Sequence, residues 1–120
     1  MNSSEHDNLI NQKDCFMKIN ELFGVSGKIA VVSGGSRGIG EMIATGLLAN
    51  GVKVYITARK EGPLVKKAKE LSAIYDGECI PVPCDLSSLD GINEFVDYIQ
   101  SQESHIDFLI NNAGASWGEP

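Results

Sequence analysis

Short apolar runs alternate along the chain with longer segments in which apolar residues recur every three or four positions. The runs cover residues 28–33, 53–58, 79–84 and 106–110, and glycines follow the first of them. A continuous apolar run bounded by turn residues is typical of a strand buried in a parallel sheet. The pattern therefore predicts four strands.

Three amphipathic helices are predicted between these strands. Their apolar positions are Ile39, Ile43 and Leu47 with Met42 and Leu48; Leu64, Ala68, Leu71 and Tyr75; and Ile92, Phe95, Val96 and Ile99. Asn50-Gly51 is a sound end for the first helix, and Pro63 fits the first turn of the second. Ser87 or Ser88 can cap the third.

The order strand–helix–strand, repeated to a fourth strand, predicts an α/β fold with a parallel sheet and right-handed crossovers. Pro81 and Pro83 mark the third strand as an edge strand, because proline cannot donate to a ladder. Three helices cover both faces of such a sheet poorly, so we expect the first half (βαβαβαβ) of a doubly wound sheet. Residues 27–120 form this incomplete domain, and residues 1–26 are expected to be a polar, partly disordered leader.

Composition narrows the class of partner. The 120 residues normally allow one domain, and the net charge is −6. Residues 28–69 hold eight Lys and Arg against two acids, whereas residues 70–120 hold ten acids and no base. An acidic chain with a basic middle suits a small anionic ligand better than nucleic acid. No apolar run reaches the roughly 18 residues of a membrane span, and the leader lacks an apolar signal core.

The histidines and cysteines point to no metal site. His6 and His105 are isolated in the sequence, and Cys15, Cys79 and Cys84 form no CxxC pair. An odd set of reduced thiols favours an intracellular protein, and we expect a cytoplasmic location. Cys84 is expected to be a small apolar residue that closes a strand rather than a reactive thiol.

The strongest local motif is the glycine-rich turn Ser33–Gly40, between a predicted strand and an amphipathic helix. Gly34 lets the chain turn sharply, Gly38 lets backbone N–H groups approach a pyrophosphate, and Gly40 lets the helix sit close to the sheet. The free N–H groups and dipole of the helix start favour an anion. A tight turn without ligand is the alternative. A Walker A loop is excluded, because Glu41 stands where it needs lysine.

Two arginines predict which dinucleotide would bind. An NAD site places Asp or Glu at the end of the second strand to hold the ribose 2′-hydroxyl. This chain has Arg59 there, and Arg37 lies in the glycine-rich turn. Arginine binds phosphate oxygens bidentately, so both residues suit the 2′-phosphate of NADP(H). The alternative is two exposed surface arginines. Glu61, the nearest acid, is expected to support a helix N-terminus.

Three motifs together resemble the short-chain dehydrogenase/reductase family. They are Ser33–Gly40, Cys84–Leu86 and Asn111–Gly114. The resemblance covers residues 27–118 and implies a Rossmann-type fold. Ser33 replaces the family's usual threonine and keeps the hydroxyl. Within the family the chain is most similar to the 3-oxoacyl-[acyl-carrier-protein] reductase branch. Residues 113–118 resemble the β-ketoacyl reductases linked to rhamnolipid synthesis.

The resemblance also implies roles for residues at the strand ends. Asp85 would accept a hydrogen bond from the adenine amino group, beside the Leu86 backbone, and Asn111 would contact the cofactor. Turn chemistry is the alternative for Asn111 and Asn112. The expected NADP(H)-binding residues are Gly34, Ser36, Arg37, Gly38, Ile39, Gly40, Arg59, Asp85, Leu86, Asn111, Ala113 and Gly114.

The chain departs from the family in its catalytic residues. The family uses Ser, Tyr and Lys, the last two spaced YxxxK, beyond its fourth strand. Tyr55, Tyr75 and Tyr98 each lack lysine four residues later, so no catalytic residue can be assigned.

The expected parent reaction is hydride transfer between NADPH and a carbonyl, such as a 3-oxoacyl thioester. We expect this chain, about half the family's usual length, to be an inactive part of such an enzyme. A truncated, non-catalytic nucleotide-binding or interaction protein is the alternative. The expected partners are the dinucleotide and a small carbonyl substrate, without nucleic acid or membrane, and the full-length form is expected to be a homo-oligomer.

Overall fold

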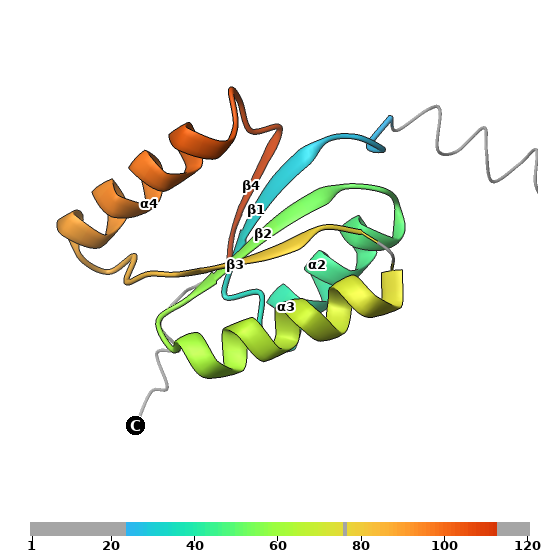
Figure 1. The fold of residues 1–120 in the computed structure, drawn as a ribbon, viewed down its shortest axis with the longest axis horizontal. Helices are drawn as coiled ribbons and strands as arrows, with labels where there is room; N and C mark the ends of the chain where they lie inside the picture. The colour runs from blue at the N-terminus through green and yellow to red at the C-terminus, as the bar shows by residue number, and fades with distance from the viewer. Residues whose placement is uncertain (1–23, 76, 113–120) are drawn as a thin grey trace, which may run out of the picture.

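The computed structural model describes residues 24–75 and 77–112 as strands and helices in strict alternation (Figure 1). The elements are β1 (Ile29–Ser33), α2 (Gly38–Ala49), β2 (Lys53–Ala58), α3 (Glu61–Tyr75), β3 (Cys79–Pro83), α4 (Leu89–Gln102) and β4 (Phe108–Asn111). The four strands pair in parallel in the order β3-β2-β1-β4. The predicted first half of a doubly wound α/β sheet is thereby confirmed. Most of the predicted leader lies outside the described residues.

Strand β3 lies at the edge of the sheet, as its two prolines predicted. Its only partner in the described sheet is β2, with Pro81 opposite Ile56 and Pro83 opposite Ala58. A proline inside the sheet would leave a neighbouring carbonyl without its ladder hydrogen bond. The prolines therefore exclude β3 from the central positions, which β1 and β2 occupy.

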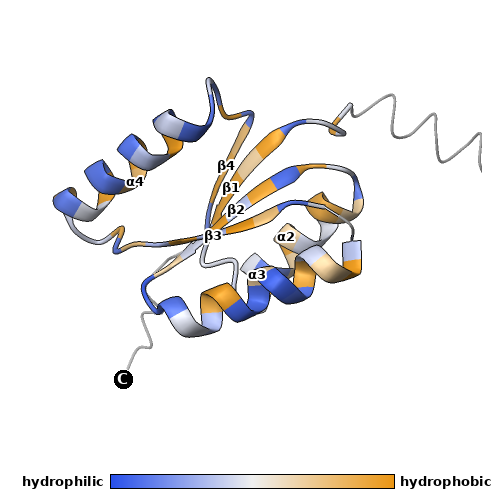
Figure 2. Ribbon diagram, in the orientation of Figure 1, coloured by the Kyte–Doolittle hydropathy of each residue, from blue (hydrophilic) through white to orange (hydrophobic). Residues whose placement is uncertain are grey.

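The sheet separates two apolar layers. Helices α2 and α3 cover one face, and α4 alone covers the other (Figure 1). Alternate residues of a strand point to opposite faces. Ala30, Val32 and Ile56 accordingly pack on the α2/α3 side, whereas Val31 and Tyr55 pack toward α4. Figure 2 shows the same division, with hydrophobic colour on the strands and on the helix sides that meet them.

Helix α2 packs on the sheet through smaller residues than the predicted stripe. Its buried positions are Gly40, Ala44 and Leu48. The prediction is wrong for Ile39 and Met42, which are 66% and 73% exposed. A Cβ on Gly40 would lie only 2.1 Å from the carbonyl oxygen of Gly34. This close approach orients the helix so that Gly40, Ala44 and Leu48 face the sheet.

Half of the apolar stripe predicted for helix α4 is confirmed. Phe95 and Ile99 are buried against the sheet, but Ile92 and Val96 remain 40% and 41% exposed. Gly91 is buried in their place, because the first turn of the helix packs on the preceding loop. Of the two predicted caps, Ser88 is the one observed: its Oγ accepts a hydrogen bond from Gly91 N at 3.0 Å.

Strand β4 begins two residues later than predicted. Asp107 N donates to Ile29 O, and Asp107 Oδ2 accepts from Ile29 N, both at 2.9 Å. The side chain of Asp107 thus binds the backbone of β1, and β4 begins at the next residue. Within residues 24–75 and 77–112, every helix falls short of the length and apolar content that a membrane crossing needs.

Candidate functional site

The carboxyl ends of the strands meet at one edge of the sheet, where the chain changes direction. From β1 the chain passes through α2 to β2 on one side, whereas β4 lies on the other side of β1. Open α/β sheets bind ligands at such a switch point. The loop that follows β1, residues 34–37, occupies this position.

The glycine-rich turn lies close over the end of β2. Gly34 has φ +70°, a left-handed conformation that favours glycine, and its N–H donates to Thr57 O at 2.8 Å. A Cβ on Gly35 would lie 2.5 Å from Cγ2 of Ile56. Position 35 therefore has no room for a side chain, a requirement that the sequence analysis did not predict. Ser36 is half-buried within the same turn.

The N-terminus of α2 opens at this turn without a side-chain cap. Arg37 occupies the N-cap position in an extended conformation, and its side chain makes no capping hydrogen bond. The first N–H groups of a helix lack intrahelical partners. Gly38 has φ +62°, and a Cβ there would meet nothing within 4 Å. This end of a 12-residue helix thus presents N–H groups without intrahelical partners, and a positive dipole end, at the open Gly38 position.

Three segments converge at Gly40. The Cβ that glycine lacks would lie 2.1 Å from Gly34 O and 2.7 Å from the side-chain nitrogen of Asn112. The start of α2, the turn after β1 and the end of β4 therefore contact one another at this residue. The prediction that Gly40 lets the helix sit close to the sheet agrees with this packing.

The hydroxyl of Ser33 joins the two strands at the switch point. Ser33 Oγ accepts from Asn112 N at 2.8 Å and lies 3.0 Å from Asn111 Oδ1 and 3.3 Å from Ile110 O as a donor. Ser33 is 2% exposed. These contacts hold the amide group of Asn111 at the mouth of the sheet. Ala113 and Gly114, also predicted to bind the cofactor, lie outside the described residues.

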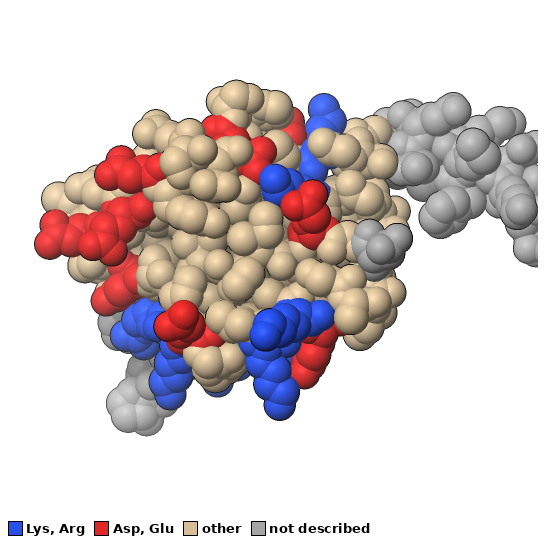
Figure 3. Space-filling model, viewed as in Figure 1, with Lys and Arg blue, Asp and Glu red and all other residues tan. Residues whose placement is uncertain are grey.

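Arg37 and Arg59 leave neighbouring strands at this edge, and both are exposed. Arg37 follows β1 and Arg59 follows β2, and these two strands are paired. Basic side chains gather over α3 and its start, whereas acidic side chains follow α4 (Figure 3). The basic middle of the sequence therefore borders the site on the α3 side.

Asp85 and Leu86 follow β3 on the same edge. Hydrogen bonds from the side chain and then the backbone of Ser87 hold the pKa of Asp85 below its usual value, and the charge of Arg59 adds to this effect. Asp85 is thus an exposed carboxylate within electrostatic reach of Arg59. Leu86 is partly buried against the core cluster that packs on α4.

Cys84 stands immediately before this carboxylate. Burial, and next the charge of Asp85, raise the pKa of its thiol. A raised pKa keeps the thiol protonated and poorly nucleophilic. Its partly buried side chain also packs against the core cluster on the α4 side, which favours the predicted packing role.

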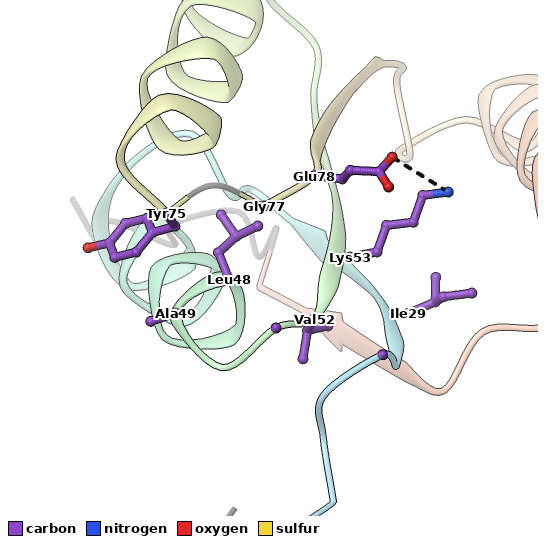
Figure 4. Close-up of a pocket in the computed structure, with 10 residues that line it drawn as sticks. Ile29, Leu48, Ala49, Val52, Lys53, Tyr75, Gly77 and Glu78 are labelled. Atoms are coloured by element: carbon purple, nitrogen blue, oxygen red, sulfur yellow. Dashed lines mark ion pairs between the residues drawn. The ribbon is translucent and has the colours of Figure 1, made fainter. Parts of the chain in front are cut away.

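A separate pocket of about 560 Å³ lies at the opposite, amino-terminal edge of the sheet (Figure 4). It is lined by the glycines that precede β1, β2 and β3, Gly27, Gly51 and Gly77, and by Lys53 and Glu78. The two charged side chains form an ion pair at 3.9 Å. None of the predicted cofactor-binding residues lines this pocket.

The chain is similar in sequence to a known protein family. A family model described as short chain dehydrogenase matches residues 28–120. The rhamnolipids biosynthesis 3-oxoacyl-[acyl-carrier-protein] reductase of Pseudomonas aeruginosa is 46% identical over 96 residues, which are 80% of this chain and 37% of that protein.

Solved structures give the same result. The P. aeruginosa RhlG/NADP active-site complex superposes with a TM-score of 0.71 and 46% identity, over 75% of this chain and 36% of that one. L-Sorbose reductase from Gluconobacter frateurii, complexed with NADPH and L-sorbose, gives a TM-score of 0.72 and 33% identity, over 75% and 34%. The chain spans about a third of the length of these proteins.

Proposed function

Because the chain belongs to the short-chain dehydrogenase family, we propose that it is the NADP(H)-binding part of an oxidoreductase that transfers hydride between NADPH and a carbonyl. The observation that carries this proposal is the uncapped N-terminus of α2 at the switch point, with Arg37 and Arg59 beside it. Residues 27–120 belong to the dinucleotide-binding domain, and residues 1–26 precede it as a leader.

The residues of this edge fit the parts of a dinucleotide. The N–H groups at Gly38, Ile39 and Gly40 suit the pyrophosphate, because they lack intrahelical partners and lie at the positive end of the helix dipole. Open space at the Cβ position of Gly38 lets a phosphate approach the backbone. Ser36 and the exposed Ile39 belong to the same turn and helix start, and Asn111 ends β4 opposite Ser33 in the sheet register.

Arg37 and Arg59 favour NADP(H) over NAD(H). A 2′-phosphate bound at the end of β2 would lie near Arg59, with Arg37 following the neighbouring strand β1, and β2 itself offers no carboxylate there. Asp85, on the next strand, suits the adenine edge. Two of the similar solved structures are complexes with NADP or NADPH, which supports the same assignment.

The bound cofactor supplies the hydride, and these residues supply binding and orientation. We assign the proton donor for the carbonyl to none of the described tyrosines. Tyr55 is 1% exposed, and burial followed by its hydrogen bond to Glu103 raises its pKa to about 12. Tyr55, Tyr75 and Tyr98 also lack a lysine four residues later, so the proposal assigns the family's catalytic Tyr–Lys pair to none of them. The 3-oxoacyl substrate is proposed from the 3-oxoacyl-[acyl-carrier-protein] reductase alone.

Titration of the intact protein with NADPH and NADH tests the proposal. We expect NADPH to bind more tightly, and Arg59→Ala to weaken NADPH about ten-fold or more while changing NADH little. Loss of one charge-assisted contact costs about 1.5–3 kcal/mol, which corresponds to that change. Lys69→Ala, which removes an exposed charge from α3, is the matched control. Equal affinities for the two nucleotides in the unmodified protein would refute the assignment.

A further inference from the structure

The first turn of α4 lies against the main chain of Asp85 at a distance that only glycine allows. Gly91 is buried, and a Cβ on it would lie 1.8 Å from Asp85 O and 2.8 Å from its carbonyl carbon. Both atoms belong to the backbone, so no side-chain rotation relieves the overlap. Any side chain at position 91 must push the Asp85 loop and the helix apart.

Glycine is otherwise a poor choice for this position. It is among the least favourable residues in a helix. Gly62, in the first turn of α3, shows the contrast, because a Cβ there would meet nothing within 4 Å. Gly91 is therefore required by what lies next to the helix.

Hydrogen bonds from the same turn fix the orientation of the Asp85 carboxylate. Ser87 N donates to Asp85 Oδ1 at 3.0 Å, and Ser87 Oγ donates to the same oxygen. Ser88 Oγ accepts from Gly91 N at 3.0 Å and lies 3.4 Å from Asp85 O. Oδ1 is thus held by Ser87, while Oδ2 accepts no hydrogen bond from the described part of the chain.

We propose that Gly91 and Ser87 are positioning residues for Asp85 and direct its second carboxylate oxygen at the 6-amino group of adenine. The inference rests on the proposed function, which assigns Asp85 to the adenine edge. A carboxylate only accepts hydrogen bonds. The amino group of adenine donates one, whereas hypoxanthine carries a carbonyl oxygen at the same position. Correct placement of Asp85 therefore distinguishes the two bases.

The test compares the affinity of the intact protein for NADPH and for its hypoxanthine analogue, deamino-NADPH, by isothermal titration. We expect the unmodified protein to prefer NADPH about ten-fold, the value of one charge-assisted hydrogen bond. Asp85→Asn, which can donate or accept, brings the ratio of affinities to within about two-fold. Gly91→Ala and Ser87→Ala each reduce the ratio to about three-fold or less, and Gly62→Ala leaves it unchanged.

The ratio separates positioning from general stability, because a loosened fold weakens both nucleotides equally. If the unmodified protein shows no preference for NADPH, the role of Asp85 in the proposed function fails. It also fails if Asp85→Asn keeps the preference of the unmodified protein. If Asp85→Asn removes the preference but Gly91→Ala and Ser87→Ala keep it, the positioning inference is overturned. Should Gly91→Ala fail to fold, the exposed Ser87→Ala decides between the two outcomes.

Discussion

Gly34, Gly35, Gly38 and Gly40 share one loop for different physical reasons. Gly34 and Gly38 adopt left-handed φ angles of +70° and +62°. Gly35 and Gly40 have no room for a Cβ, because Ile56 lies against the first and the Gly34 backbone against the second. Gly38 alone combines a left-handed conformation with open space in front of a helix N-terminus. This combination distinguishes a ligand-facing glycine from a structural one.

Replacement of Gly38 by valine is therefore expected to abolish NADPH binding. The branched side chain would fill the space through which the pyrophosphate approaches the backbone. Gly27→Val is the matched control, because Gly27 also has a left-handed φ, +82°, and an open Cβ position, but lies at the opposite edge of the sheet. Both variants lose similar stability, about 1–2 kcal/mol, from backbone strain. Retention of affinity in Gly38→Val would show that the turn is only structural.

The Ser33 hydroxyl gives a second prediction at this scale. Ser33→Ala leaves the Asn112 N–H and the Asn111 side chain without this partner, in a site where Ser33 is 2% exposed. We expect a loss of about 1–3 kcal/mol in the free energy of unfolding, measured by denaturant titration. Ser33→Thr keeps the hydroxyl and should recover most of the loss. A Thr variant as unstable as the Ala variant would contradict the role of the hydroxyl.

At the scale of elements, the sequence predicts the strands better than the helix faces. The strand runs and the edge position of β3 follow from local features, apolar residues and prolines that act within their own segment. The face of α2 depends on a contact between Gly40 and the Gly34 carbonyl, which no spacing of apolar residues encodes. The position of Gly91 against Asp85 is likewise a property of two segments. In the sequence, the signal for this contact is that Gly91 stands in the first turn of a predicted helix.

The end of α4 is joined to β2 by one carboxylate. Glu103 pairs with Lys53 and accepts a hydrogen bond from Tyr55, which also contacts Tyr98 of α4 edge-to-face. Lys53 and then Tyr55 hold the pKa of Glu103 below its ordinary value of 4.5. Because the pKa is lowered in the folded state, these contacts stabilise the fold fully above the ordinary pKa of 4.5. The stabilisation is lost as the pH falls through the folded pKa.

Glu103→Gln is thus expected to reduce stability at pH 7, on the order of 1 kcal/mol, and to weaken the dependence of stability on pH below about 4.5. Glu94→Gln, on the exposed side of the same helix, is the matched control. Denaturant midpoints at pH 7 and at about pH 3.5 measure both effects. If both variants keep the acid response of the unmodified protein, Glu103 does not carry it.

At the scale of the whole molecule, the two faces of the sheet are covered unequally. Helices α2 and α3 cover one face, whereas α4 alone packs on the other (Figure 1). Strand β4 is paired on one side only in the described sheet, and its Leu109 is 70% exposed. An apolar strand with a free edge is a template for pairing with another chain. The sequence predicted this uneven coverage from the number of helices and strands.

The 120-residue polypeptide produced by itself is therefore expected to self-associate and to show no reductase turnover. Association follows from the β4 edge and the exposed apolar residues Ile39, Met42 and Leu109. NADPH binding would add only a few kcal/mol to the free energy of unfolding at accessible concentrations. Turnover fails for a separate reason, because no tyrosine of the chain is followed by lysine at the YxxxK spacing.

Sedimentation, thermal unfolding and NADPH oxidation with a 3-oxoacyl thioester distinguish these two causes. Leu109→Lys places a charge on the free edge, so it should reduce association and leave turnover absent. A monomeric unmodified polypeptide with a cooperative unfolding transition would contradict the argument from the β4 edge. Measurable NADPH oxidation would contradict the catalytic argument, and it would do so whether or not the polypeptide associates, because the proton donor is required in either state.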